Sequence, residues 1–271
     1  MRYSPIYNPN QQGVVLIVVL LFLILIALAG AMAVRQSNTD LKTATADQIN
    51  TILLQSSDSA NERLEAVING STTSEPYKEA LSQAGLFGYY ILGKNTQGNE
   101  YIYCFNPRDR KYLIKNATVK QGAGSVHDNN GYCDYTKPNG FTSDRQVVAT
   151  QMNITTTPTT PATEAFSDMA IGKDAEATTS KKINFDFRAT SILPSYSEPI
   201  DNTGTSCLRK SSIPVVSGTA TTTPILTCLH TANTPSKMTY QQATLENKAE
   251  GTVCIPFGTG TLDTACTITG S

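Results

Sequence analysis

The chain has 271 residues, with 21 Lys and Arg against 22 Asp and Glu, six Cys and no Trp. The charges nearly cancel and are scattered, which argues against a nucleic-acid partner, because affinity for the phosphate backbone needs clustered basic residues. Beyond an apolar N-terminal stretch, the sequence is poor in large apolar side chains and rich in Thr, Ser, Asn and Gly. It therefore predicts a β-rich domain with a thin core that gains from cross-links.

The first expected element is an apolar helix over residues 14–34. This stretch, VVLIVVLLFLILIALAGAMAV, contains no charged residue and is long enough to cross a bilayer. A cleaved secretory signal usually has a shorter apolar core, but the ALAGAMA segment resembles a cleavage site, so a signal peptide stays an alternative. No proline occurs between Pro9 and Pro76, which predicts that the helix continues beyond the membrane.

An amphipathic helix is expected over residues 35–70. Its apolar residues recur at spacings near three, four and seven, which places them on one face of a helix. They are Leu41, Ile49, Ile52, Leu53, Ala60, Leu64, Val67 and Ile68. Asn69-Gly70 is a suitable C-terminal cap. A one-sided stripe implies that a globular domain of the same chain packs against this helix.

The predicted domain is α+β: a long helix packed on an antiparallel sheet within residues 86–193. Short runs rich in Tyr, Ile, Val and Phe between turn residues predict strands at 89–92, 100–105, 111–119, 146–155 and 181–193. The Thr/Pro-rich segment near 155–180 predicts an exposed loop. Sheet packing, with ligand stacking as the alternative, is the expected role of six aromatic residues: Phe87, Tyr89, Tyr90, Tyr101, Tyr103 and Tyr112.

All six cysteines follow the apolar run, and four of them lie in the C-terminal region 194–271. The absence of a Cys-x-x-Cys pair weakens zinc and thioredoxin-like interpretations. An even number of cysteines beyond a membrane-crossing segment favours disulfides in an oxidising compartment. Six cysteines allow fifteen sets of disulfide pairs. We expect each cysteine to pair with its nearest neighbour in the sequence: Cys104–Cys133, Cys207–Cys228 and Cys254–Cys266. Free buried thiols are the alternative.

No motif for catalysis, for a metal or for another cofactor stands out. The segment VHDNNGYCD resembles a calcium loop, but Val126 and Lys137 occupy the two end positions where that pattern needs acidic ligands. A turn built from Asn and Gly is the better interpretation. The two histidines, His127 and His230, have no neighbouring nucleophile motif. We therefore expect no enzymatic activity and no cofactor.

The stretch QQGVVLIVVLLFLILIALAG, with the following AVRQS, resembles the N-termini of type IV pilins, specifically minor pilins of the PilX type. The resemblance covers residues 1 to about 65. It implies a leader peptide, residues 1–13, that prepilin peptidase removes at the cytoplasmic face by cutting between Gly13 and Val14. It also implies methylation of the new amino terminus.

Val18 departs from the family pattern. Most pilins carry Glu at this position, where it is thought to pair with the amino terminus of a neighbouring subunit in the filament. A buried carboxylate without such a partner is costly, and Val avoids that cost but cannot supply the charge. The departure suggests a subunit at a filament end or in a priming complex.

The resemblance implies a minor pilin of the type IV pilus, present at low copy and acting in pilus assembly, adhesion or motility. Its expected partners are other minor and major pilins, prepilin peptidase and a tip adhesin. Its expected location is the inner membrane, single-pass with a periplasmic C-terminal domain, and the pilus surface after assembly. The alternatives are a pseudopilin of a type II secretion system and a membrane-anchored periplasmic binding protein.

Overall fold

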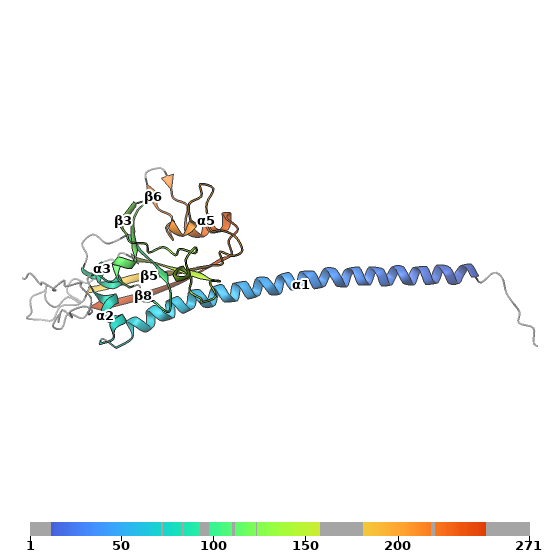
Figure 1. Ribbon diagram of the computed structural model, residues 1–271, viewed down its shortest axis with the longest axis horizontal. Helices are drawn as coiled ribbons and strands as arrows, with labels where there is room; N and C mark the ends of the chain where they lie inside the picture. The colour runs from blue at the N-terminus through green and yellow to red at the C-terminus, as the bar shows by residue number, and fades with distance from the viewer. Residues whose placement is uncertain are drawn as a thin grey trace, which may run out of the picture. The chain divides into compact units, whose positions relative to one another are not determined.

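The computed structural model describes residues 12–71, 73–82, 84–92, 98–109, 112–122, 124–157, 181–217 and 220–247. The chain forms two compact units, Met1–Ile49 and Asn50–Ser271. Helix α1 (Gln12–Ile68) is continuous and contributes to both units (Figure 1). It ends where the sequence predicts, because the N–H groups of Asn69 and Gly70 bond to the carbonyls of Glu65 and Val67 at 2.9 and 3.4 Å.

The second unit is built on a six-stranded antiparallel sheet in the order β3-β2-β1-β4-β5-β8. The strands are β1 (Asn99–Phe105), β2 (Thr118–Gln121), β3 (Gly124–Asp128), β4 (Ala149–Thr157), β5 (Lys181–Ile192) and β8 (Ser236–Asn247). A separate hairpin comprises β6 (Val216–Ser217) and β7 (Ala220–Thr221). The short helices are α2 (Glu75–Leu81), α3 (Leu86–Leu92) and α5 (Ile225–Thr231), with 3-10 turns η2 (Ile114–Asn116), η3 (Pro138–Gly140) and η4 (Cys207–Arg209). The α+β prediction is confirmed.

The expected strands are partly confirmed. Those predicted at 100–105, 146–155 and 181–193 correspond to β1, β4 and β5. The strand predicted at 89–92 is wrong, because these residues belong to helix α3. Leu86, Phe87 and Tyr90 are all buried, and their spacing of one and three residues suits a helix. The strand predicted at 111–119 is also mostly wrong: η2 occupies its centre, and β2 begins only at Thr118.

The C-terminal part of α1 covers one face of the sheet, as the stripe predicts. Ala60, Leu64 and Val67 are at most 6% exposed and pack in a core with aromatic side chains of β1 and β5. Two predicted stripe members are not buried, because Leu41 is 67% and Ile52 44% exposed. The buried face instead includes the polar residues Ser57 and Asn61. Of the remaining predicted stripe residues, Leu53 is buried, and Ile49 and Ile68 are half-buried.

The aromatic cluster belongs to this core, so the packing interpretation is confirmed. Five of its six members are at most 6% exposed. The Tyr90 hydroxyl lies 2.8 Å from the Asn99 carbonyl oxygen and 2.9 Å from that of Ile154, and it accepts from the Tyr101 N–H at 3.1 Å. Burial raises the pKa of Tyr90 well above its ordinary value. Tyr90 is therefore a buried neutral group that joins α3 to β1 and β4.

Candidate functional site

The first candidate site is the apolar start of α1. Within the described residues, one helix is long and apolar enough to cross a membrane, and this segment lies in it. Residues 14–34 span about 31 Å at 1.5 Å per residue, close to the ~30 Å hydrocarbon core of a bilayer. None of their side chains is buried; Val14 is 63% exposed and Val34 63%. The segment therefore has the length and surface of a single-pass anchor.

The predicted processing residues lie in the first turns of this helix. Gly13 follows the first residue of α1, Gln12, and Val14 comes next. Val18 lies one turn further on the same face as Val14 and is 48% exposed. Residues 1–11 of the predicted leader lie outside the described residues. Residues 14–34, which surround Val18 on the helix, contain no Asp or Glu.

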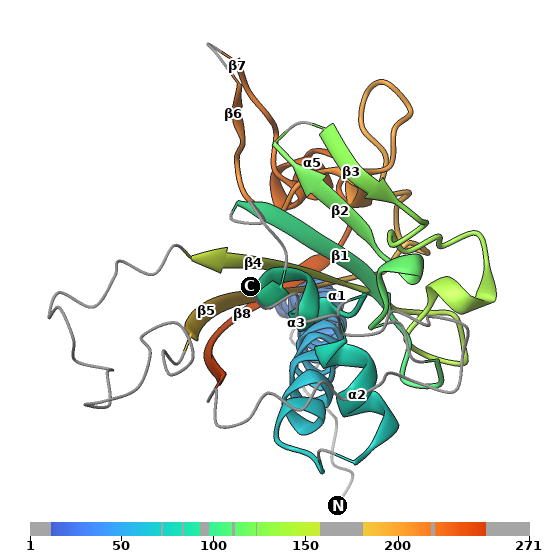
Figure 2. The same ribbon diagram turned by 90° about the vertical axis from the view of Figure 1, so that its left-hand side faces the viewer.

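The second candidate site is the face of the sheet opposite α1. Residues 194–217 and 220–235, here called the outer layer, lie on this face, where Figure 2 labels helix α5. Their buried hydrophobic residues come from η4 and α5. Successive side chains of a strand point to opposite faces, so Tyr101 and Tyr103 enter the helix-side core while Cys104 enters the outer one. Strand β1 is buried at all seven positions. The outer core contains Cys104, Cys133, Phe141, Ala149, Ile192, Cys207, Leu208, Ile225, Cys228 and Leu229.

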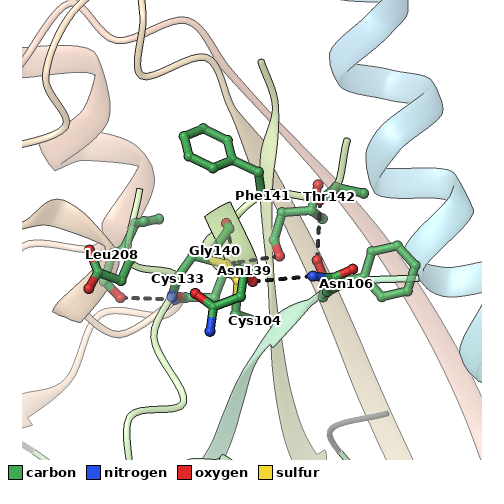
Figure 3. The surroundings of a disulfide bond; sticks show 12 residues. Cys104, Asn106, Cys133, Asn139, Gly140, Phe141, Thr142 and Leu208 are labelled. Atoms are coloured by element: carbon green, nitrogen blue, oxygen red, sulfur yellow. Dashed lines mark hydrogen bonds between the residues drawn. A yellow bond between two sulfur atoms is a disulfide. The ribbon is translucent and has the colours of Figure 1, made fainter. Parts of the chain in front are cut away.

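Two disulfides hold this side of the molecule together. Cys104–Cys133 joins the end of β1 to the loop after β3, with a Cα–Cα distance of 4.7 Å (Figure 3). Cys207–Cys228 joins η4 to α5 at 5.5 Å. Loop closures of 29 and 21 residues correspond to about 3.6 and about 3.3 kcal/mol of stabilisation through the unfolded state. Both pairs agree with the nearest-neighbour prediction, while Cys254 and Cys266 lie outside the described residues.

A buried carboxylate also attaches the outer layer to the sheet. Glu100 is 3% exposed and accepts hydrogen bonds from the backbone N–H of Ser212 at 2.8 Å and from Nδ2 of Asn153 at 2.8 Å. The Ser211 hydroxyl donates to its other oxygen. Sequence reasoning missed this contact, since a single Glu at the start of a strand gives no sign that a later segment covers it.

A polar cluster occupies the same face of β5 and β8. Asp186 accepts from Tyr240 Oη and Gln242 Nε2, both at 2.8 Å, and from Thr157 Oγ1 at 2.9 Å. The Arg188 guanidinium lies 3.7 Å from Asp186 and 5.1 Å from the centre of the Tyr240 ring. Burial alone would raise the pKa of Asp186, but these hydrogen bonds and the Arg188 charge lower it. The cluster is internally paired, which leaves it no obvious free ligand-binding group.

The described part of the C-terminal region, which ends at Asn247, is continuous with the main sheet. Its strand β8 pairs with β5 over twelve residues, so the chain returns to the main sheet after the outer layer. The Thr/Pro-rich loop predicted near 155–180 lies outside the described residues from 158 onward, and Thr157 still belongs to β4.

Within the segment 126–134, residues 126–128 belong to β3, and the predicted turn follows at Asn129 and Asn130. Asn130 has a positive φ of 61°, and a Cβ on Gly131 would lie 2.2 Å from the Ile102 carbonyl oxygen. His127 is exposed in β3 beside Tyr89, and His230 is exposed in α5. Within the described residues, no group of three or more His, Cys, Asp and Glu side chains is arranged to hold a metal ion.

Comparisons of the chain with protein-family models, with curated proteins and with solved structures find no match.

Proposed function

We propose that the protein is a minor pilin of the type IV pilus, an assembled structural subunit without catalytic activity. The observation that carries the proposal is the division of α1. Residues 14–34 expose apolar side chains on every face, whereas Leu53, Ala60 and Leu64 of the same helix are buried under a sheet of the same chain. An anchor alone needs no such covered extension, whereas a subunit that stacks its helix with others does.

The proposed mechanism keeps the apolar segment out of water at every stage. Lipid surrounds residues 14–34 in the inner membrane, and after extraction a bundle of like helices replaces the lipid. The disulfide-linked sheet and outer layer stay outside and offer surface to other pilins and to a tip adhesin. Val18 supplies no carboxylate for the amino terminus of a neighbouring subunit, which supports a low-copy position at a filament end or in a priming complex.

The mass of the N-terminal peptide of the mature protein tests the proposal. We expect a chain that begins at Val14 with a methylated amino group in cells that contain prepilin peptidase, and the full leader in cells that lack it. Gly13→Val should block cleavage, because the small residue gives the peptidase access to the bond. Gly30→Val is the matched control: no atom lies within 4 Å of a Cβ added there, so cleavage should persist.

An intact Met1 in peptidase-containing cells would refute the proposal and favour a membrane-anchored periplasmic binding protein. Loss of about 30 residues would instead indicate a secretory signal. A type II secretion pseudopilin has the same N-terminal processing, so subunit counting in purified pili distinguishes that class. A low but reproducible copy number supports a minor pilin, a number equal to that of the major pilin refutes the low-copy role, and complete absence from pili favours the pseudopilin.

A further inference from the structure

A cleft of about 400 Å³ lies between the loop after β3 and the η4 turn of the outer layer. This volume falls within the range of about 300–1,000 Å³ that is usual for small-molecule sites. The Cys104–Cys133 disulfide forms part of its lining, and Figure 3 shows Asn139 and Gly140 beside the two cysteines. The lining residues include three charged ones, Asp134, Lys137 and Arg209, and the polar residues Asn130, Tyr132, Tyr135 and Ser206.

The walls of this cleft are held in place without a ligand. On the loop side, Asn106 Nδ2 donates to the Asn139 carbonyl at 3.3 Å. Hydrogen bonds from Thr136, together with Lys137 at 2.9 Å, lower the pKa of Asp134 to about 2. A Cβ on Gly140 would lie 2.0 Å from the Asp134 carbonyl oxygen, so the loop folds tightly on itself. Pre-formed walls reduce the entropy cost of binding.

The η4 wall is equally fixed. Lys120 Nζ donates to the Arg209 carbonyl at 2.8 Å, and Gln151 Nε2 donates to the Leu208 carbonyl at 2.9 Å. The Cys207–Cys228 disulfide adds a covalent link. The backbone that carries Arg209 is therefore positioned by two strands and by α5.

Arg209 supplies the binding charge. Its guanidinium lies 5.2 Å from the centre of the Tyr132 ring, a distance at which the ring attracts a cation. Among the described residues, no Asp or Glu forms an ion pair with it, whereas the other cation of the cleft, Lys137, is paired with Asp134. A guanidinium that is oriented by an aromatic ring and lacks an acidic partner is suited to a carboxylate ligand, which it can bind with two hydrogen bonds.

We propose that this cleft binds an acidic saccharide, with the sugar carboxylate on Arg209. Tyr135, which is a second aromatic residue of the lining and packs partly against the outer core, would stack on the apolar side of the sugar. Asn130 and Ser206, also in the lining, would bind its hydroxyls. The lining contains no Leu, Ile, Val, Met or Phe, so it has no pocket for the apolar anchor of a peptide. One cation without a partner also suits a single carboxylate better than a row of phosphates.

The test is titration of the full-length protein in detergent with glucuronate, with glucose as the uncharged counterpart, followed by calorimetry and saturation-transfer NMR. We expect glucuronate to bind at millimolar concentration and glucose to bind at least about tenfold more weakly, a ratio that corresponds to about 1.4 kcal/mol. Arg209→Gln should remove this preference. Arg145→Gln, which changes an exposed arginine outside the cleft, should leave it intact.

Tyr135→Ala separates the stacking contribution from the charge, and it should weaken glucuronate and glucose by a similar factor. Circular dichroism of each variant verifies that the fold is retained. Equal affinity for the two sugars, unchanged glucuronate affinity in Arg209→Gln, or no glucuronate binding at about 50 mM, well above typical weak affinities, would each overturn the proposal. Binding of a DNA oligonucleotide or an acidic peptide in place of glucuronate would also overturn it. None of these outcomes depends on whether the chain enters a pilus.

Discussion

Replacement of Glu100 by Ala should weaken the attachment of the outer layer to the sheet while the helix-side core stays folded. The substitution removes the acceptor of three donors on Ser211, Ser212 and Asn153, residues that are 5%, 9% and 0% exposed. Each buried donor left without a partner costs about 1–3 kcal/mol. Since the side chains of Ser211 and Asn153 can turn to other acceptors, we expect a total loss near the lower end of the sum for three donors, about 3–5 kcal/mol. Glu100→Gln keeps one oxygen acceptor and should lose about 1–2 kcal/mol.

Denaturant unfolding of the full chain in detergent measures these losses, and hydrogen exchange localises them. Amide exchange should accelerate at Ser212 and in η4 before it does so in α1. Glu62→Ala is the matched control, because Glu62 is exposed on α1 and its removal should change the unfolding free energy by less than about 0.5 kcal/mol. Equal losses in Glu100→Ala and Glu62→Ala, or unchanged exchange at Ser212, would show that the buried carboxylate does not hold the outer layer.

Three further outcomes are expected from substitutions on the helix-side core and on β5. Leu64→Ala should lower the unfolding free energy by about 3 kcal/mol because it opens a cavity in the core. Leu41→Ala, the control, should change this free energy by less than about 0.5 kcal/mol. Equal losses of the two variants in urea unfolding would contradict the burial of the stripe. Tyr90→Phe should cost about 1–2 kcal/mol in the same assay, since the Tyr101 N–H loses its acceptor, and an unchanged midpoint would contradict this. Asp186→Asn should be less stable than the parent at neutral pH. Because the folded pKa of Asp186 is lowered, this difference should shrink as the pH falls below about 4, the unfolded value, and a constant difference in Tm from neutral to acidic pH would refute the role of its charge.

The sequence predicted the long elements because their patterns extend over many residues. The α1 stripe persists for several turns, and β1 and β5 are rich in residues that favour strands. The predicted strand at 89–92 is a helix because a run of only seven residues, six of them apolar or aromatic, suits either structure, and the packing of Phe87 and Tyr90 decides between them. The predicted stripe differs from the buried face of α1 because hydropathy alone assigns Ile52 to the buried face and Ser57 to the exposed one. In the structure, Ile52 is exposed and Ser57 is buried.

The candidate sites were predicted to different extents. The two cysteine pairs followed from sequence proximity, because loops of 29 and 21 residues close easily. The Glu100 contact did not, because its partner Ser212 lies 112 residues away. The cleft was also missed: its walls come from the loop around Tyr132 and from Arg209, two segments with no shared pattern in the sequence. Contacts between distant segments depend on the topology of the chain, which local patterns do not encode.

The distribution of apolar residues supports a lipid or helix-bundle environment for residues 14–34. Sixteen large apolar side chains in this segment are 48–70% exposed. If each loses about half of the 1.5–3 kcal/mol that full burial contributes, their exposure to water costs about 12–24 kcal/mol. This cost is comparable with the net stability of a whole domain, about 5–15 kcal/mol, and folding of the sheet does not reduce it, because none of residues 14–34 belongs to the helix-side core. Removal of the segment from lipid therefore requires another apolar surface to take the place of the lipid. A bundle of equivalent helices provides such a surface, and this energetic requirement is the physical basis of the proposed assembly.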